Sequence, residues 1–339
     1  MHGPARPATL GGLQAPYSHC FCALQAMPET PQHSQTASLS NRLPPSLLAL
    51  GAILLWGTLA ALGVALAHVP PFLLTGLALG VGGLLALPLS GFDLKRWRVP
   101  PATLALGVGG LFGFHFLLFM ALRLAPPVQA NLINYLWPLF MVLLSPLLLP
   151  GLRLRRVHIA AALLGFAGAG VVILAGPAEA PGRPSGWSWG YLLALLSALV
   201  WASYSLLTRR VAHFQTAAIG GFALVSALLS LVCHAALEPR VALSLRDLLL
   251  IAALGLGPMG AAFFLWDMAL KRGDPRQIGI LSYLTPLAST ALLVLSGERA
   301  FSWSIALAAL MIVAAALLGT RPSAAADPKA ALKSKVYQP

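Results

Sequence analysis

The residues best suited to bind a solute stand close together in the run Asn131-Leu-Ile-Asn-Tyr-Leu-Trp-Pro138, inside an otherwise apolar stretch. On a helix, Asn131, Asn134 and Tyr135 recur at i, i+3 and i+4, so two amides and a phenol share one face. Each amide would be costly against lipid without a partner, so this face turns either toward a binding site or toward helices that satisfy it. Pro138 removes a backbone donor and predicts a bend at the same place.

Two other apolar segments carry polar and aromatic stripes. The first stripe consists of Ser197, Trp201, Tyr204, Ser205 and Thr208, which recur on one helical face. The second consists of Ser282, Tyr283, Pro286, Ser289 and Thr290. Such stripes are more often core packing than binding sites, but rings that alternate with hydroxyls favour a central cavity, with Trp56 as a further candidate for its wall.

Two titratable residues lie inside apolar segments. His115 is about 12 Å from a helix end, where a neutral imidazole either lines the cavity or bonds a neighbouring carbonyl. Asp267 can bind an ammonium group, titrate in proton coupling or pair with Lys271 at i+4. A lone histidine and a lone carboxylate on different helices form no catalytic constellation, so an enzyme is the least favoured class. Fixed positive charge is absent at mid-depth, which argues against phosphorylated solutes.

The composition requires a membrane around these residues. With 58% hydrophobic and 9% charged residues, the chain lies far outside the soluble range. Apolar segments are expected at 46–67, 71–90, 101–122, 127–149, 158–176, 188–208, 217–237, 248–270, 277–297 and 303–319. The expected fold class is therefore an all-α polytopic membrane protein with ten transmembrane helices. Its net charge of +13 resides in loops, so the partner is the lipid bilayer and not nucleic acid.

The basic residues also predict the orientation. Eleven Lys and Arg fall in even-numbered loops and five in odd-numbered loops, which places both termini in the cytoplasm. Residues 1–44 and 321–339 lack apolar cores and are expected to be disordered. Cys20 and Cys22 beside His19 do not complete a metal site, so neither metal nor cofactor is expected.

The sequence repeats itself. Met120-Ala-Leu-Arg123 recurs as Met268-Ala-Leu-Lys271, and Tyr135-Leu-Trp-Pro-Leu139 recurs as Tyr283-Leu-Thr-Pro-Leu287, both 148 positions later. Two five-helix repeats at 45–180 and 187–320 are expected, and because five is odd they enter the membrane from opposite sides. Inverted repeats predict alternating access, with Pro138 and Pro286 as equivalent hinges. The alternative is an inert duplicated bundle.

Three runs carry a family resemblance: N-Y-L-W-P at 134–138, W-A-S-Y at 201–204 and S-Y-L-T-P at 282–286. They resemble the bacterial aromatic amino-acid exporters of the drug/metabolite transporter superfamily, EamA type, and the likeness extends from about Ser46 to Thr320. The resemblance implies a basket-like carrier in the bacterial inner membrane that exports Phe, Tyr, Trp and related amphipathic solutes. It also implies that His115, Tyr135, Trp137 and Trp201 line the central cavity.

The expected site combines rings for the solute's side chain with polar groups for its zwitterion. The rings are those of Trp137, Trp201, Tyr204 and Tyr283, and the polar groups are His115, Asn131, Asn134 and hydroxyls such as that of Ser282. An alternative carrier takes other amphipathic or cationic solutes with Asp267 as the counter-charge. A channel or a non-transporting scaffold is the alternative from another class. A monomeric carrier is compatible with this pattern, and proton coupling and facilitated diffusion both stay open.

Overall fold

The computed structural model describes residues 43–174, 188–297 and 300–320, and all regular secondary structure in these ranges is helical. Nine apolar helical spans there are long enough to cross a bilayer, and a shorter apolar helix makes a tenth. The ten are Pro45–Ala65, Pro71–Leu89, Pro101–Leu124, Pro127–Leu148, Arg156–Leu174, Trp189–Leu207, Thr216–Leu237, Leu245–Arg272, Pro275–Leu295 and Trp303–Gly319. The prediction of an all-helical protein with ten membrane spans is confirmed. The expected disorder of both tails and the Cys20-x-Cys22 pair fall outside the described residues.

Pairs of prolines set where four of these spans begin. The second proline of each pair is the first residue of α2 (Pro45–Gly57), α4 (Pro71–Leu84), α6 (Pro101–Val108) and α8 (Pro127–Asn134). Proline suits this position because its missing N–H would have no intrahelical partner there and its fixed φ already matches a helix. The sequence therefore determines these helix starts locally.

Two spans contain a π-helical turn at equivalent places. The third span consists of α6, the turn η2 (Gly109–Gly113) and α7 (Phe114–Leu124). The eighth consists of α13 (Leu245–Leu256), the turn η4 (Gly257–Ala261) and α14 (Ala262–Arg272). The two turns lie 148 positions apart, the same offset as the sequence repeat. π turns loosen the backbone ladder and occur frequently at functional sites.

Two further spans are broken at equivalent places. The fourth span breaks between α8 and α9 (Trp137–Leu148), and the ninth between α15 (Pro275–Leu281) and α16 (Leu284–Leu295). Pro138 and Pro286 each lie in the first turn after the break. The bend expected at Pro138 is thus a full interruption just before it, at Tyr135 and Leu136.

The first span also divides, into α2 and α3 (Leu59–Ala65), whereas its counterpart α11 (Trp189–Leu207) is continuous. The remaining elements are α5 (Ala86–Leu89), η1 (Leu94–Trp97), α10 (Arg156–Leu174), η3 (Thr216–Ala218), α12 (Ile219–Leu237) and α17 (Trp303–Gly319).

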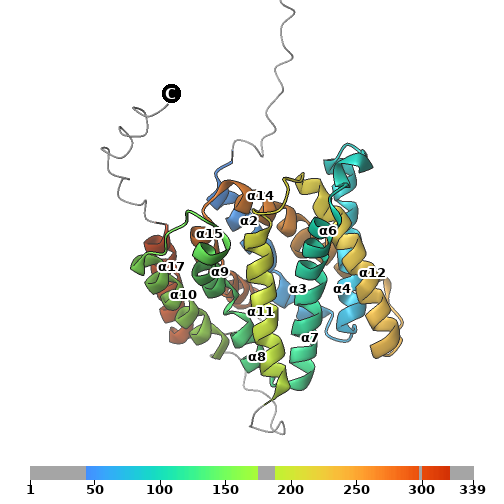
Figure 1. Ribbon diagram of the computed structural model, residues 1–339. Coiled ribbons are helices and arrows are strands. Elements are labelled where there is room, and N and C mark those ends of the chain that lie inside the picture. Colours follow the sequence, from blue (N-terminus) through green and yellow to red (C-terminus); the bar gives the residue numbers. More distant parts are fainter. Residues whose placement is uncertain (1–42, 175–187, 298–299, 321–339) are drawn as a thin grey trace, which may run out of the picture. The chain divides into compact units, whose positions relative to one another are not determined.

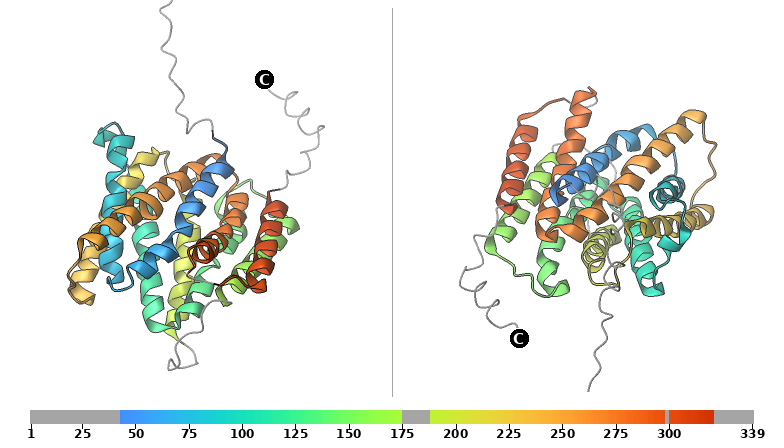
Figure 2. Two further views of the ribbon diagram at one scale, coloured as in Figure 1. Left: turned by 180° about the vertical axis from the view of Figure 1, so that it is seen from behind. Right: turned by 90° about the horizontal axis from the view of Figure 1, so that it is seen from above.

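The spans pack in pairs that the sequence order does not suggest. α10 lies along α17, and α4 lies along α12, as Figures 1 and 2 show. Glycines permit these close approaches: a Cβ on Gly76 of α4 would lie 2.7 Å from the Leu231 side chain of α12. α11 contacts both α7 and α9, and α14 contacts α2. These last contacts bring the aromatic residues of both halves together.

Candidate functional site

Four tryptophans from four helices meet in one buried group, called here the tryptophan cluster. Its members are Trp56 on α2, Trp137 on α9, Trp201 on α11 and Trp266 on α14. Their ring centroids lie 5.1 to 6.5 Å apart in edge-to-face or tilted pairs, and each ring is at most 7% exposed. Since the rings contact one another, they fill the space between these four helices.

Residues related by the sequence repeat contact each other here. Trp56 and Trp201, 145 positions apart, have ring centroids 5.9 Å apart. His115 and Phe263, 148 positions apart, have centroids 6.4 Å apart. A residue can touch its own counterpart only close to the axis that relates two repeats. The tryptophan cluster therefore lies where such an axis passes.

Hydrogen bonds hold two of the rings in place. The indole N–H of Trp56 donates to the carbonyl of Pro258, in the π turn η4, over 3.0 Å. The indole N–H of Trp266 donates to the hydroxyl of Ser205 over 3.2 Å. A buried indole needs such a partner, and the loosened π turn supplies a carbonyl that a regular helix would keep within its own ladder.

The polar residues of the fourth span lie in different surroundings. Asn134 is buried, and its side-chain oxygen accepts a 2.8 Å bond from Ser197 on α11. Asn131 and Tyr135 remain half-buried. On α11, Trp201 and Tyr204 have ring centroids 5.5 Å apart, so Tyr204 extends the tryptophan cluster along that helix.

Tyr283 lies elsewhere. It is fully buried among Ala169 and Val172 of α10 and Ala308 and Ile312 of α17. A Cβ on Gly165 of α10 would lie 2.4 Å from its ring. The neighbouring Ser282 hydroxyl donates to the carbonyl of Gly279 within its own helix. The structure therefore separates Tyr283 and Ser282 from the rings of Trp137, Trp201 and Tyr204.

His115 adjoins the cluster through Phe114 and Phe263, with ring centroids 5.1 and 6.4 Å away. Its Nδ1 lies 2.6 Å from the carbonyl oxygen of Leu111, which belongs to the π turn η2. This distance requires that Nδ1 carries the proton and donates it. In the neutral imidazole, Nε2 is then the acceptor.

Asp267 forms the ion pair that its spacing from Lys271 allowed. Its Oδ2 lies 2.6 Å from Lys271 Nζ and also accepts a 2.6 Å bond from the Thr216 hydroxyl. The Asp267 side chain is 3% exposed. Lys271 Nζ donates to the Phe214 carbonyl and lies 3.8 Å from that ring's centroid.

The repeat counterpart of Lys271, Arg123, forms an ion pair at the opposite end of the bundle. Arg123 lies 2.9 Å from Glu238, whose side chain is fully buried. Glu238 also accepts the backbone N–H groups of Phe72 and Leu73 in the first turn of α4, and contacts His234 at 3.0 Å. The sequence did not indicate Glu238, because this residue lies just after a helix and its partners come from α4, α7 and α12.

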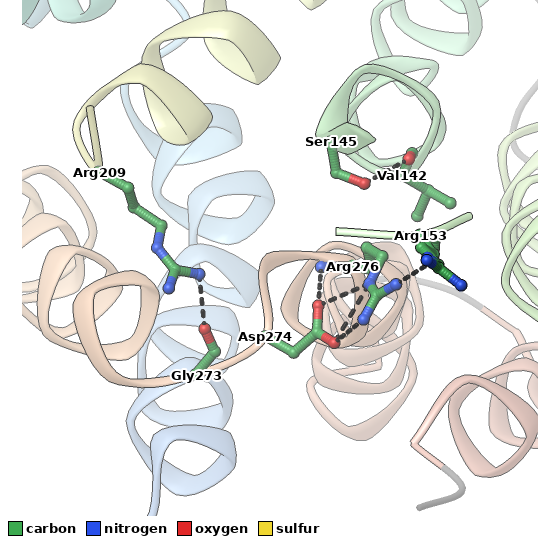
Figure 3. A network of polar contacts seen from close by, with 7 residues as sticks. All are labelled: Val142, Ser145, Arg153, Arg209, Gly273, Asp274 and Arg276. Atoms are coloured by element: carbon green, nitrogen blue, oxygen red, sulfur yellow. Dashed lines mark hydrogen bonds and ion pairs between the residues drawn. The ribbon is translucent and has the colours of Figure 1, made fainter. Parts of the chain in front are cut away.

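Further polar contacts tie the loops at the Lys271 end (Figure 3). Arg209 donates to the carbonyl of Gly273 over 2.9 Å, and Arg276 pairs with Asp274 and donates to the carbonyl of Arg153. Burial raises the pKa of Asp274, but the hydrogen bonds and charge of Arg276 outweigh it and hold that pKa below its ordinary value.

The sequence profile of the EamA-like transporter family matches residues 43–174 and, a second time, residues 188–320. The chain belongs to this family. This EamA-like protein is accordingly a membrane transporter and not an enzyme.

Several known proteins are similar over most of their length. The chain is 44% identical to a protein named aromatic amino acid exporter YddG from Ancylobacter novellus, over 83% of this chain and 98% of that protein. It is 28% identical to an uncharacterized inner membrane transporter, YhbE, from Escherichia coli, over 71% of this chain and 77% of that protein. A solved crystal structure with 43% identity superposes with a TM-score of 0.74 over 81% of this chain and 97% of that one.

Proposed function

We propose that this EamA-like protein exports aromatic amino acids and related amphipathic solutes across the bacterial inner membrane by alternating access. The observation that carries the proposal is the tryptophan cluster, which gathers four rings from four helices at the contact between repeat-related residues. A ligand ring that enters between them would replace ring-to-ring contacts with equivalent ones of its own, each worth about 0.5–1.5 kcal/mol. The name of the Ancylobacter novellus relative agrees with this substrate class.

Polar groups next to the cluster would meet the rest of the substrate. His115 has an acceptor nitrogen beside the aromatic rings, and the Asn134–Ser197 pair offers an amide and a hydroxyl. Asn131 and Tyr135 are half-buried. Tyr135 lies in the break of the fourth span, and Asn131 lies one helical turn before it. Tyr204 would contribute a further ring, whereas Tyr283 would support the packing of α10 and α17.

The proposed mechanism uses the two repeats as alternating halves. The family profile matches each half separately, which supports repeats at 45–180 and 187–320. The basic loops support a cytoplasmic location for both termini and for the end of the bundle that holds Lys271. A single chain contains both halves, so a monomer suffices.

A carrier of cationic solutes with Asp267 as the counter-charge is a weaker candidate. Lys271 already neutralises Asp267 at 2.6 Å, so a solute with a single positive charge would have to displace a lysine and leave it unpaired. The tryptophan cluster carries no such penalty for a solute whose net charge is zero.

Counterflow of labelled tryptophan into proteoliposomes preloaded with unlabelled tryptophan tests the proposal. We expect saturable uptake by the wild-type protein, and an affinity about tenfold lower in Trp137→Ala, because that ring contacts three others. The matched control is Trp303→Ala, which removes a ring that is 85% exposed and lies outside the cluster.

Uptake that does not saturate would indicate a channel instead. If both variants lost affinity equally, the tryptophan cluster would not be the substrate-binding site. A pH gradient imposed in the same assay distinguishes proton coupling from facilitated diffusion, since only the former responds to it.

A further inference from the structure

A hollow of about 290 Å³ opens beside the Asp267–Lys271 ion pair. The segment from His213 to Thr216 forms one wall, and Met268, Lys271 and Arg272 form the other. Its lining therefore combines cationic and hydroxyl groups with the Phe214 ring and a thioether. The hollow is large enough for a small organic solute and carries groups for both a charged and an apolar part.

Lys271 brings one side of the ion pair into the wall of this hollow, and Asp267 lies directly behind it. Thr216 and Lys271, which line the hollow, are the two residues that bond Asp267 Oδ2. The adjacent residue in the chain, Trp266, belongs to the tryptophan cluster and contacts Trp56 and Trp137. Asp267 thus bonds two residues that line the hollow and is next in the chain to a member of the cluster.

One oxygen of Asp267 remains unused. Oδ2 carries both bonds, whereas Oδ1 is buried and has no hydrogen-bond partner among the described residues. A buried carboxylate normally satisfies both oxygens, because an orphaned one retains its full desolvation cost. Asp267 therefore has spare capacity to accept a donor.

The Arg123–Glu238 ion pair at the opposite end of the bundle provides a comparison, because its carboxylate has hydrogen-bond partners on both oxygens. Arg123 is the repeat counterpart of Lys271, and each cation lies over a phenyl ring, at 5.5 and 3.8 Å from its centroid. Both oxygens of Glu238 accept hydrogen bonds. The orphaned oxygen thus distinguishes Asp267 from a purely structural carboxylate in a comparable place.

We propose that the hollow receives a zwitterionic amino acid, and that the amino acid opens the Asp267–Lys271 pair by exchange. The ligand carboxylate pairs with Lys271, and the ligand ammonium pairs with Asp267. Two charges on the protein then meet two opposite charges on the ligand, so no buried charge is left without a partner. The inference rests on the proposed function, which supplies the substrate class.

The exchange predicts a preference for ligands that carry both charges. Tryptamine has only the ammonium group and would leave Lys271 unpaired, whereas indole-3-propionate has only the carboxylate and would leave Asp267 unpaired. Each should inhibit tryptophan counterflow about tenfold more weakly than unlabelled tryptophan does, since each lacks one charged hydrogen bond.

The deciding variant is the double substitution Asp267→Asn with Lys271→Gln, which removes both charges and leaves neither partner unpaired. We expect tryptophan to lose its advantage, so that the three compounds inhibit within about threefold of one another. The matched control, Asp274→Asn with Arg276→Gln, removes another ion pair at the same end and should keep the wild-type preference.

Met268→Trp provides a second, independent variant, because it fills the hollow and leaves the ion pair intact. It should lower the affinity for tryptophan several-fold without changing the ranking of the three compounds. Wild-type preference in the double variant, or unchanged affinity in Met268→Trp, would overturn the inference while counterflow itself stands. Absence of tryptophan counterflow in the wild-type protein would instead overturn the proposed function, and this inference with it.

Discussion

At the scale of single residues, Glu238 joins parts of the chain that are far apart in sequence. Its carboxylate accepts the free N–H groups at the start of α4, pairs with Arg123 at the end of α7 and contacts His234 on α12. The first N–H groups of a helix have no intrahelical partner and carry partial positive charge, so a buried anion is stabilised there. One side chain thereby fixes three spans at this end of the bundle.

Glu238→Gln should therefore destabilise the protein. The neutral amide leaves Arg123 without its counter-charge and bonds the α4 N-terminus more weakly, at a cost of about 1–3 kcal/mol. A lower midpoint of thermal unfolding in detergent would show the loss. The control is Asp93→Asn, because that carboxylate is exposed and lies 3.7 Å from an equally exposed Arg96. Equal midpoints for both variants would contradict this role of Glu238.

At the scale of elements, the interruptions of the helices are the features most closely tied to motion. The third and eighth spans contain π turns, and the fourth and ninth spans are broken, each at matching positions of the two halves. Missing ladder bonds make bending inexpensive, and hinges commonly lie at the ends of elements. We therefore propose the paired breaks as the hinges of the alternating access proposed above.

Replacing Pro138 and Pro286 together by alanine tests this role. Alanine restores the backbone donors and would allow each broken span to close into a continuous helix, which should slow tryptophan exchange while equilibrium binding persists. Counterflow rates and binding, measured on the same preparation, separate these two effects. The matched control is Pro146→Ala, because Pro146 lies inside α9, away from the break. An unchanged exchange rate in the double variant would count against hinges at these positions.

At the scale of the whole molecule, the charge distribution and the repeat are linked. Lys and Arg concentrate in the even-numbered loops, and the equivalent cations Arg123 and Lys271 end their helices at opposite ends of the bundle. An odd number of spans per half has this consequence, because the second copy must start from the other side. The same arrangement brings Trp56 against Trp201.

The orientation follows as a prediction that cysteine labelling can check. In a background with Cys20, Cys22 and Cys233 replaced by serine, Arg240→Cys should react with an impermeant maleimide in intact cells. Arg210→Cys should react only after lysis, since the more basic side stays in the cytoplasm. Both positions are exposed, so accessibility at the protein surface does not limit the reaction. Labelling of Arg210→Cys in intact cells would reverse the proposed orientation.

The sequence by itself determined the number of spans, their limits and the repeat. Apolar length, paired prolines and loop charge are local properties, and bilayer thickness converts them directly into helices. It also made Trp137, Trp201 and Asn134 candidates for the site, because stripes of rings and amides are unusual in a membrane segment.

Only the tertiary structure decided which of these residues meet. Tyr283 has the same sequence signal as Tyr135, yet the packing of α10 against α17 encloses it away from the tryptophan cluster. Trp266 and Phe263 complete the centre because α14 contacts α2, and Glu238 is buried only because α4, α7 and α12 converge on it. Periodicity specifies which face of a helix is polar, but the neighbour that this face meets depends on how all ten spans pack together.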